Sequence, residues 1–254
     1  MMIRVVNLRK SLGDQKILRG VDLMIPKGKI TAIIGRSGGG KSILLKHLIG
    51  LIRPDSGEIW VGGEEITSLT RRALSRVKTR FGFLFQGAAL FDSMTVFENI
   101  AFPLREKTEH AEKAIRAKVE ETLREVGLEG VGEKYPGELS GGMKKRVGLA
   151  RAMILHPEIM LFDEPTTGLD PVMEHVIDRL IQACHGGSNC TGVLVSHNIS
   201  EVFAIAHHVA MLHHGIIIAQ GTPEEIRASV HPVVRQFIHG EIEGPMQDAL
   251  EGEG

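Results

Sequence analysis

The chain of 254 residues is 43% hydrophobic, 24% charged and only 4% aromatic, and its formal net charge at pH 7 is −1. This composition is typical of a globular protein with a real core, and it excludes the general basic surface through which proteins bind DNA or RNA, so we expect no nucleic-acid partner. No apolar run approaches the ~18 residues needed to span a bilayer, and the first residues lack the apolar centre of a signal peptide, so a role at a membrane would need a protein partner.

Short strand-like runs alternate with longer helical patterns, which predicts one α/β domain with insertions. The first clear strand is expected at Ile30–Ile34, followed by a helix at Lys41–Leu51 that ends near Gly50 and Pro54. The residues expected on the buried face of this helix are Leu44, Leu48 and Leu51. The glycine-rich residues 35–42 therefore join a strand to a helix.

Further elements are expected along the rest of the chain. Two strands are expected at Glu58–Val61 and Phe81–Phe85, and the pattern changes at residues 108–126 to a long helix that begins a helical insertion. The inward side chains of this helix are Ile115, Val119, Leu123 and Val126. Strand patterns return at Ile159–Asp163, Gly192–Ser196, Val209–Leu212 and Ile216–Ala219.

The last expected helix begins at residue 222. Thr222 is placed as the N-cap, Pro223 lies in the first turn, and Glu225 completes a capping box. Beyond Arg235 the chain carries no Lys or Arg and ends in a sparse acidic tail.

Residues 35–42, GRSGGGKS, contain the parts of a phosphate-binding loop. Such a loop needs converging backbone amides, glycines that allow it to curl tightly, a lysine for the terminal phosphates and a hydroxyl for Mg²⁺. Gly35, Gly40, Lys41 and Ser42 match this template in order. An ordinary glycine turn is the alternative, but the position between a strand and a helix favours nucleotide binding.

Two adjacent acids follow the apolar strand in IMLFDEP, residues 159–165. An acid at a strand end is often only a solubilising cap. Here, however, Asp163 can hold Mg²⁺ through water while Glu164 polarises the attacking water. His197 follows the strand-like VLVS and is a candidate for orienting that water or the γ-phosphate, although a single histidine is usually structural.

The stretch LSGGMKKR, residues 139–146, decides the class of protein. Ser140, Gly141 and Gly142 leave backbone amides at the mouth of a helix that runs through Leu155, and such a helix end attracts phosphate. A plain helix start with Ser140 as N-cap is the alternative. At this point the sequence resembles the ATP-binding cassette (ABC) family. In that family two copies pair head to tail, and the glycine loop of one copy and the signature of the other enclose each ATP.

The resemblance covers about residues 2–229, and six motifs occur in the family's order. They are the Walker A loop at Gly35–Ser42, the Q-loop glutamine Gln86, the signature at Leu139–Met143, Walker B at Ile159–Glu164, the D-loop at Gly168–Pro171 and the switch histidine His197. The resemblance implies an ATPase that works by dimer closure and reopening. It also implies an α/β fold, an ABC-type nucleotide-binding domain with a P-loop RecA-like core, an antiparallel β subdomain and a helical subdomain.

The family's functional residues map onto this chain position by position. The resemblance implies catalysis by Glu164, His197, Gln86 and Lys41, and Mg²⁺ binding by Ser42, Gln86 and Asp163. It implies ATP contacts from Gly35, Arg36, Ser37, Gly38, Gly39, Gly40, Lys41, Ser42, Ile43 and Leu12, and from Ser140, Gly141 and Gly142 of the signature. It assigns residues 1–88 and 157–229 to the core with its β subdomain, 89–156 to the helical subdomain and 230–254 to a C-terminal tail.

A closer resemblance is carried by residues 85–106 and 234–245, together with Met143. These segments are similar to the ATPase subunit of the Mla-type phospholipid transporters of Gram-negative bacteria, which work with a membrane permease and an MCE-type lipid-binding protein. The resemblance implies a homodimer on the cytoplasmic side of the inner membrane that drives phospholipid transport between the two membranes. An ABC importer or exporter of another cargo is an alternative. A non-transport ABC ATPase is a further one, although the chain has no heptads and no second Walker A.

Two positions depart from the family's pattern, and the tail allows two interpretations. Leu12 stands where most members stack adenine on an aromatic ring, which affects base affinity and selectivity. Met143 stands where many members have glutamine, so the signature's contact rests more on Ser140 and backbone amides. The tail is either a frayed acidic end or, as in the subfamily, a contact with the neighbouring subunit; its apolar residues are Val233, Val234, Phe237 and Ile238.

Three weaker signals receive plain interpretations. The basic residues Arg71, Arg72, Arg76, Lys78 and Arg80 are interpreted as a solvated helix face, with a surface for anionic headgroups or an acidic partner as the alternative. The paired histidines His207, His208, His213 and His214 lack the usual spacing of metal ligands and are interpreted as surface residues. Cys184 and Cys190 are too few for a disulfide framework and are interpreted as ordinary side chains, which suits a reducing cytoplasm.

Overall fold

The computed structural model describes residues 1–188 and 190–246, and its chain forms two units. The first unit combines residues 1–69 with the chain from residue 195 onward, and the second unit is residues 70–194. The predicted helical segment, residues 89–156, lies inside the second unit. The predicted subdomain boundaries stay a prediction.

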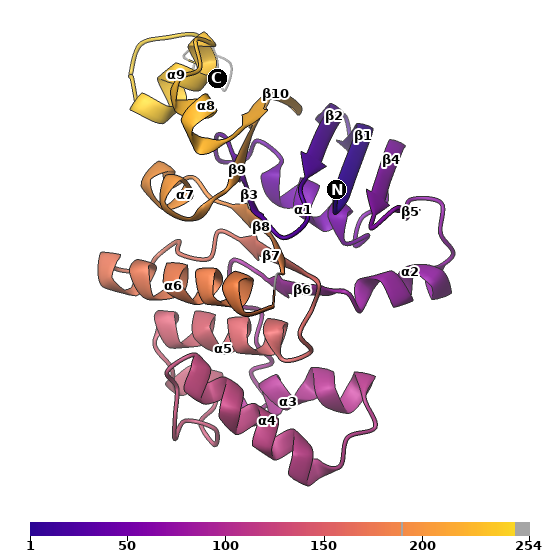
Figure 1. Ribbon diagram of the computed structural model, residues 1–254, viewed down its shortest axis with the longest axis vertical. Coiled ribbons are helices and arrows are strands. Elements are labelled where there is room, and N and C mark those ends of the chain that lie inside the picture. Colours follow the sequence, from indigo (N-terminus) through magenta and orange to yellow (C-terminus); the bar gives the residue numbers. More distant parts are fainter. Residues whose placement is uncertain (189, 247–254) are drawn as a thin grey trace. The chain divides into compact units, whose positions relative to one another are not determined.

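The first unit contains an antiparallel sheet in the strand order β2-β1-β4-β5 (Figure 1). Its strands are β1 (Ile3–Leu12), β2 (Gln15–Ile25), β4 (Ser56–Val61) and β5 (Glu64–Glu65). β1 and β2 form a hairpin whose turn contains Gly13 at φ 57°, and β1 pairs with β4 on its other side. The expected strand Glu58–Val61 is confirmed within β4, and the resemblance's antiparallel β subdomain is present.

The first unit also holds the strand that precedes the glycine-rich loop. β3 (Ile30–Ile34) is buried along its whole length and runs parallel to β9 (His208–His213), which pairs antiparallel with β10 (Ile216–Gly221). The three strands predicted here are confirmed, and β3 begins and ends at the predicted residues. Helix α1 (Lys41–Leu48) follows the loop.

One prediction for α1 is wrong. Leu44 and Leu48 are fully buried as expected, but Leu51 is 50% exposed. The helix ends at Leu48, and Gly50 turns the chain with φ 70°, so Leu51 leaves the helical register of the buried face.

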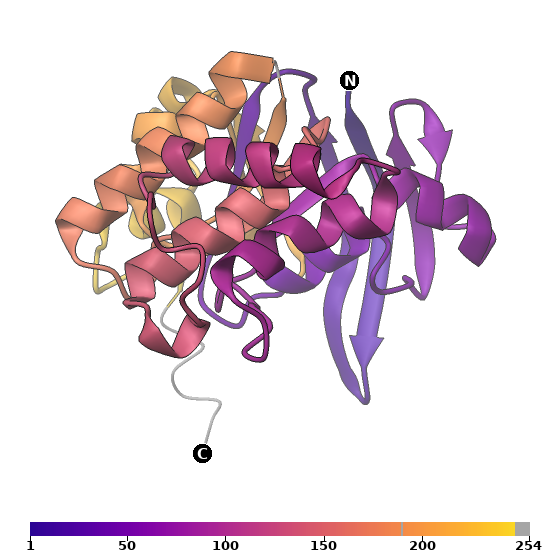
Figure 2. The same cartoon turned by 90° about the horizontal axis from the view of Figure 1, so that it is seen from below.

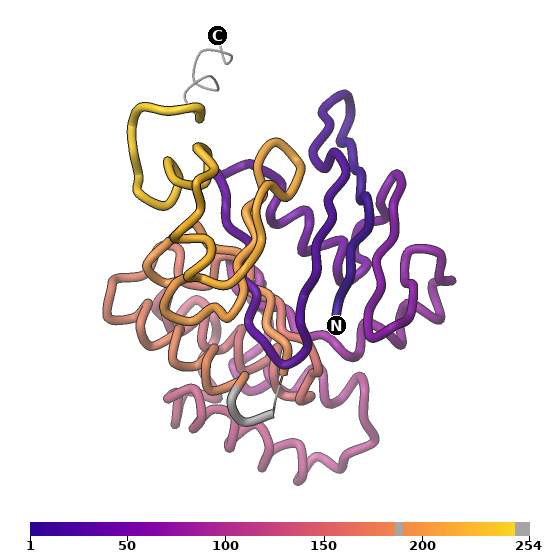
Figure 3. The backbone as a smooth tube through the Cα atoms, turned by 45° about the horizontal axis from the view of Figure 1, so that its top comes forward, coloured from indigo at the N-terminus to yellow at the C-terminus, as the bar shows by residue number. Residues whose placement is uncertain are grey.

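Three short helices cover the strands β3 and β9 with one apolar cluster. They are α7 (Ile199–Ile205), α8 (Pro223–Arg227) and α9 (Pro232–His239), and Figure 3 shows the chain of α8 and α9 returning beside β10. The capping box of α8 is confirmed, because Thr222 accepts a hydrogen bond from the Glu225 amide while the Glu225 carboxylate accepts one from the Thr222 amide. The start of this short helix is therefore set by local sequence.

The structure corrects one interpretation of the tail, the frayed end, as far as residue 246. The four apolar residues Val233, Val234, Phe237 and Ile238 pack on the cluster of their own unit, and Val234 is fully buried. The tail is therefore helical at Pro232–His239 and not frayed there, while Val233, Phe237 and Ile238 stay half-buried, so a contact with a neighbouring subunit stays a prediction. The rest of the tail, residues 247–254, lies outside the described residues.

The second unit has its own strands, in the order β8-β7-β6. They are β6 (Phe81–Leu84), β7 (Ile159–Asp163) and β8 (Thr191–Val195), and β6 runs parallel to β7. The predictions of these strands are confirmed to within one residue at each end. α2 (Arg71–Lys78) precedes β6 along the chain, and α6 (Pro171–Ser188) follows β7 and precedes β8. Arg71, Arg72 and Arg76 of α2 are exposed, which agrees with their interpretation as a solvated helix face.

A layer of three helices completes the second unit (Figure 2). α3 (Val96–Lys107), α4 (Glu112–Glu125) and α5 (Gly141–Met153) share one apolar cluster, and a 3-10 turn at Pro136–Glu138 precedes α5. All four side chains predicted to point inward near α4 are buried. Within the described residues, no helix is long and apolar enough to cross a bilayer.

A sulfur-lined cavity of about 420 Å³ lies in the second unit. Its lining includes Met153, Met160, Cys184 and Cys190, and the Cys184 thiol lies 3.7 Å from the Met153 sulfur. Burial raises the pKa of Cys184 to about 12 and that of Cys190 to about 11. Neither forms a disulfide, which agrees with their interpretation as ordinary side chains.

Candidate functional site

The glycine-rich loop of the first unit leads from β3 into α1. Gly35 adopts φ 145° and Gly40 adopts φ 93°, conformations that favour glycine. A Cβ at Gly35 would overlap the carbonyl oxygen of Leu212, and a Cβ at Gly40 would lie 2.9 Å from Ile17. Gly40 is the N-cap of α1 and offers no side-chain cap, so the first amides of the helix are suited to an anion.

Lys41 is held across its own loop. Its Nζ donates to the carbonyl oxygens of Gly35 and Arg36, each at 2.8 Å, and only 4% of the residue is exposed. Ser42 and Ile43 follow in the first turn of α1 and are half-buried. The predicted Lys41 and Ser42 are thus placed at the start of the helix, beside the amides of the loop.

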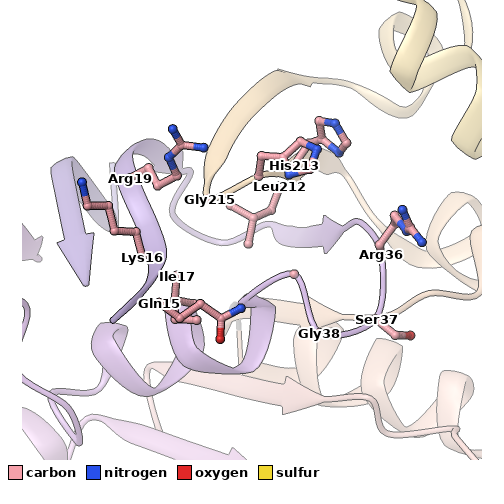
Figure 4. A pocket seen from close by; sticks show the side chains of 12 residues that line it. Gln15, Lys16, Ile17, Arg19, Arg36, Ser37, Gly38, Leu212, His213 and Gly215 are labelled. Atoms are coloured by element: carbon pink, nitrogen blue, oxygen red, sulfur yellow. The ribbon is translucent and has the colours of Figure 1, made fainter. Parts of the chain in front are cut away.

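A cavity of about 410 Å³ opens beside this loop. Figure 4 shows Lys16 and Arg19 of β2 on one side of it and Arg36 and Ser37 of the loop on the other. Three cationic side chains therefore surround a space next to glycine amides, which suits an anionic ligand. Leu12 is 47% exposed at the end of β1 and does not line this cavity.

Two of the paired histidines, His213 and His214, line the same cavity, and the structure corrects in part the description of all four as surface residues. His207 and His214 are exposed, but His208 and His213 are half-buried. Burial lowers the pKa of His213, and the nearby His214, Arg36 and His231 lower it further. Among the described residues, no group of three or more His, Cys, Asp or Glu side chains could hold a metal ion.

Arg36 faces the C-terminal segment. Its Nη1 donates to the carbonyl oxygen of Met246 at 3.2 Å. The buried Gln236 holds the same segment, because its Oε1 accepts from the Met246 amide at 2.7 Å and its Nε2 donates to the Glu241 carbonyl at 3.2 Å. The guanidinium that the resemblance assigns to the nucleotide is therefore engaged by the chain's own tail.

In the second unit, the structure brings two predicted catalytic residues together. Gln86 Nε2 donates to Glu164 Oε2 at 3.2 Å, although 78 residues separate them. Thr167, which the sequence did not single out, donates to the same oxygen at 3.0 Å. Glu164 has φ 46°, an unusual value for a residue with a side chain, and the preceding Asp163 is only 5% exposed.

The loop after β7 also receives a lysine that the sequence analysis missed. Lys145 of α5 donates to the backbone carbonyls of Glu164 and Thr167, at 3.3 and 2.7 Å. Only 7% of Lys145 is exposed. Its closeness in sequence to the signature was the one available signal, and sequence alone gives no reason to link it to Glu164.

The signature lies at the N-terminus of α5. Ser140 is the N-cap and accepts a hydrogen bond from the Met143 amide at 3.3 Å. Ser140 and Gly141 are exposed, whereas Gly142 is buried against Met173. The helix is thus capped by Ser140 and presents exposed backbone at its positive end.

The remaining predicted residues divide between the units. Lys41, Ser42 and the exposed His197 belong to the first unit, whereas Gln86 and Asp163 belong to the second. Ser42, Gln86 and Asp163 offer hydroxyl, amide and carboxylate oxygens, the donors that suit Mg²⁺. Their joint action on one ion stays a prediction.

The chain is similar in sequence and structure to known proteins. Residues 18–167 match the family model described as ABC transporter. The probable ribonucleotide transport ATP-binding protein mkl of Mycobacterium leprae is 44% identical, over 96% of this chain and 70% of that protein. The intermembrane phospholipid transport system ATP-binding protein MlaF of Haemophilus influenzae is also 44% identical, over 97% of this chain and 93% of that protein.

A solved structure is similar as well. A dimeric ATP-binding cassette in a post-hydrolysis state, bound to ADP and Pi, superposes with a TM-score of 0.81 at 29% identity. The superposition covers 87% of this chain and 99% of that one.

Proposed function

Because this chain belongs to the ABC transporter family, we propose that its ATPase activity drives a membrane permease that moves phospholipid between the inner and outer membranes. The fold is that of an ABC nucleotide-binding cassette, and the protein hydrolyses ATP with Mg²⁺. Cassettes of this family dimerise and work with membrane permease components. We further propose the cargo, the partners and the role of each site residue.

The length of the match supports phospholipid as the cargo. MlaF and mkl share the same identity with this chain, but the alignment covers 93% of MlaF and 70% of mkl. The chain therefore aligns nearly end to end with the phospholipid transport protein. A ribonucleotide cargo is the second candidate, because the name of mkl carries it at equal identity.

ATP binding is assigned to the glycine-rich loop. The amides from Gly38 to Ile43 surround the phosphates, and Lys41 exchanges its bonds with loop carbonyls for the β- and γ-phosphates. Ser42 and Asp163, with the side-chain oxygen of Gln86, would hold Mg²⁺, which neutralises charge on the phosphate oxygens. Leu12 provides an exposed apolar surface for the base.

Hydrolysis is assigned to Glu164 as general base. Its carboxylate is oriented by Gln86 and Thr167, and it accepts a proton from the water that attacks the γ-phosphate. His197 orients the γ-phosphate. The contact between Gln86 and Glu164 is the observation that carries this assignment, because two residues selected independently from the sequence are joined by one hydrogen bond.

The signature is assigned to the ATP of a second copy. Ser140 and Gly141 present exposed backbone at the start of α5, which suits the γ-phosphate across a head-to-tail homodimer. Ser140→Arg should block dimer closure, which gel filtration of Glu164→Gln protein with ATP would detect. A closed dimer that forms normally when both copies carry Ser140→Arg would contradict this assignment.

We assign binding of the permease to the aromatic surface formed by Phe91 and Phe102, which follows Gln86 in the chain. Phe91 and Phe102 are 43% and 36% exposed, and the centroids of their rings lie 5.2 Å apart. Arg151 fixes this surface by donating to the Ala88 carbonyl at 2.8 Å while it lies over the Phe91 ring. An exposed aromatic pair on a rigid support suits an apolar helix of a membrane partner.

The test of transport is to extract the full-length protein from its native membranes in mild detergent and identify what accompanies it by mass spectrometry. We expect a permease, an MCE-type lipid-binding protein and phospholipid, which would place the protein on the cytoplasmic face of the inner membrane. Phe102→Asp should lose the permease and retain ATP binding, whereas Tyr135→Asp, an exposed aromatic residue of the same unit, should retain both. A permease without lipid or an MCE-type protein would contradict the cargo.

A further inference from the structure

We propose that Lys145 is a positioning residue for ATP hydrolysis, because its ammonium joins the signature helix α5 to the loop that carries Glu164. The inference rests on the proposed role of Glu164 as general base. Lys145 itself touches neither ATP nor water in this scheme and acts through the backbone of the catalytic loop.

Two hydrogen bonds of the Lys145 side chain are directed at that loop. The Nζ donates to the carbonyl oxygen of Thr167 at 2.7 Å and to that of Glu164 at 3.3 Å. These carbonyls lie at the two ends of the segment that also supplies the Thr167 hydroxyl to Glu164 Oε2. One ammonium therefore fixes the start and the end of the segment that positions the carboxylate.

The loop needs such support because its backbone is strained. Glu164 has φ 46°, a conformation that costs a residue with a side chain about 1–3 kcal/mol and persists only where its surroundings hold it. The carboxylate is bound by Gln86 and Thr167, but those bonds keep their geometry only if the backbone of Glu164 is held in place. The Lys145 contact to the Glu164 carbonyl supplies this restraint at the strained residue.

The neighbouring basic residues show that the placement is specific. Lys144 is half-buried, and Arg146 donates to the carbonyls of Val126 and Gly127 at 3.1 and 2.9 Å. Lys145 is the one of these three that is almost fully buried, with 7% exposed. Burial of an ammonium carries a desolvation cost that its polar partners must offset. An apolar side chain at position 145 would avoid this cost.

The position on α5 gives this contact a second consequence. Lys145 lies five residues after Ser140, so about 7–8 Å of rigid helix separates the signature from the contact with Glu164. A displacement of the signature is therefore transmitted to the backbone of the catalytic carboxylate. Lys145 thus connects the end of the helix proposed to bind the partner's ATP with the base that acts on the chain's own ATP.

The test compares three variants of the full-length protein. For Lys145→Met we expect kcat to fall about 10- to 100-fold while the Kd and KM for ATP stay within about twofold of wild type, because a misplaced base slows chemistry and not binding. Lys145→Arg should recover most of the rate, since a guanidinium can donate to two carbonyls. Lys144→Met, which removes the same charge from the same helix, should behave as wild type.

A purely structural role is separated by stability and by a double-mutant cycle. Melting temperature is measured for each variant; if Lys145→Met does not fold, Lys145→Gln replaces it with an uncharged donor. In a Glu164→Gln background, Lys145→Met should cause no further loss of rate, because the base it positions is gone. Additive losses, or a wild-type kcat in folded Lys145→Met, would overturn the inference.

Failure of the proposed base would look different. If Glu164→Gln hydrolysed ATP at the wild-type rate, the assignment of Glu164 would fall, whatever the Lys145 variants did. If Glu164→Gln stalled hydrolysis while the Lys145 variants kept their kcat, only the positioning role would fall.

Discussion

Two loops of this protein, residues 35–42 and residues 163–167, both follow a buried strand but keep their shapes in different ways. The first is formed by backbone: Gly35 and Gly40 adopt conformations that other residues avoid, and Lys41 is bonded to carbonyls of its own loop. The second is held from outside, because Glu164 depends on side chains from other parts of its unit. The contrast indicates that the first loop keeps its shape through local contacts, whereas the position of Glu164 depends on tertiary contacts.

Removal of the carboxylate proposed as general base should separate the two loops most clearly. In Glu164→Gln, the amide keeps the shape of the side chain but cannot accept the proton, so we expect hydrolysis to fall about 10²- to 10⁴-fold. ATP binding through residues 35–42 should be unchanged, and the protein should accumulate as a closed dimer. Phosphate release measures the first effect and calorimetric titration the second. A normal rate of turnover would assign the base to another residue.

Loss of the lysine in the first loop should produce the opposite pattern. Lys41→Ala removes the proposed contact with the β- and γ-phosphates, and we expect ATP affinity to fall roughly 10- to 100-fold, because charge-assisted hydrogen bonds contribute about 1.5–3 kcal/mol. Calorimetry measures the affinity. Lys46→Ala, on the outer part of the same helix, should bind ATP like wild type, and an equal loss in both variants would contradict the assignment.

A methyl group added to the first loop should test its dependence on backbone. In Gly35→Ala, the new Cβ meets the Leu212 carbonyl and the residue keeps an unfavourable φ of 145°, so we expect the free energy of unfolding to fall by about 2 kcal/mol. Gly38→Ala has no atom within 4 Å of its Cβ and should lose less. Denaturant unfolding of both variants measures the difference, and equal losses would refute the steric argument.

The smallest effect should come from the histidine behind the first loop. His47 is fully buried, its Nδ1 bonds to the Ile43 carbonyl at 2.7 Å, and burial lowers its pKa from 6.5. When the pH falls below 6.5, the histidine takes up a proton in the unfolded chain but not yet in the folded protein. The contribution of His47 to the free energy of unfolding is therefore fully present above pH 6.5 and declines as the pH falls below it. Melting temperatures from neutral pH to about pH 5 should decline less in His47→Gln, and identical slopes would argue against this contribution.

The same contrast explains what could be predicted from sequence. The glycine-rich loop is a contiguous pattern between a strand and a helix, so both its position and its chemistry could be inferred from local residues. The acids at 163 and 164 were found in the same way. Lys145 was missed because only the tertiary fold brings α5 to the loop after β7, and Thr167 was missed because the sequence does not show that its hydroxyl turns back to Glu164.

Among the elements that the sequence analysis did not predict, β1 and α3 have interrupted patterns. In β1 the alternation of buried residues fails between Val5 and Leu8, where the pairing with β2 shifts and Asn7 adopts φ 45°. In α3, Pro103 lies inside the helix and hides its period. The capping box between Thr95 and Glu98 was a local signal that could have revealed α3.

The sulfur-lined cavity of the second unit has a practical consequence for following the protein during ATP turnover. A cysteine reacts with a thiol-specific dye as the thiolate, which attacks the dye, and the raised pKa values of Cys184 and Cys190 keep both groups protonated near neutral pH. A cysteine introduced at an exposed position such as Ser75 or Ser93 would react far faster. Fluorescent probes on two such copies can therefore follow closure and reopening during turnover with both native cysteines left in place.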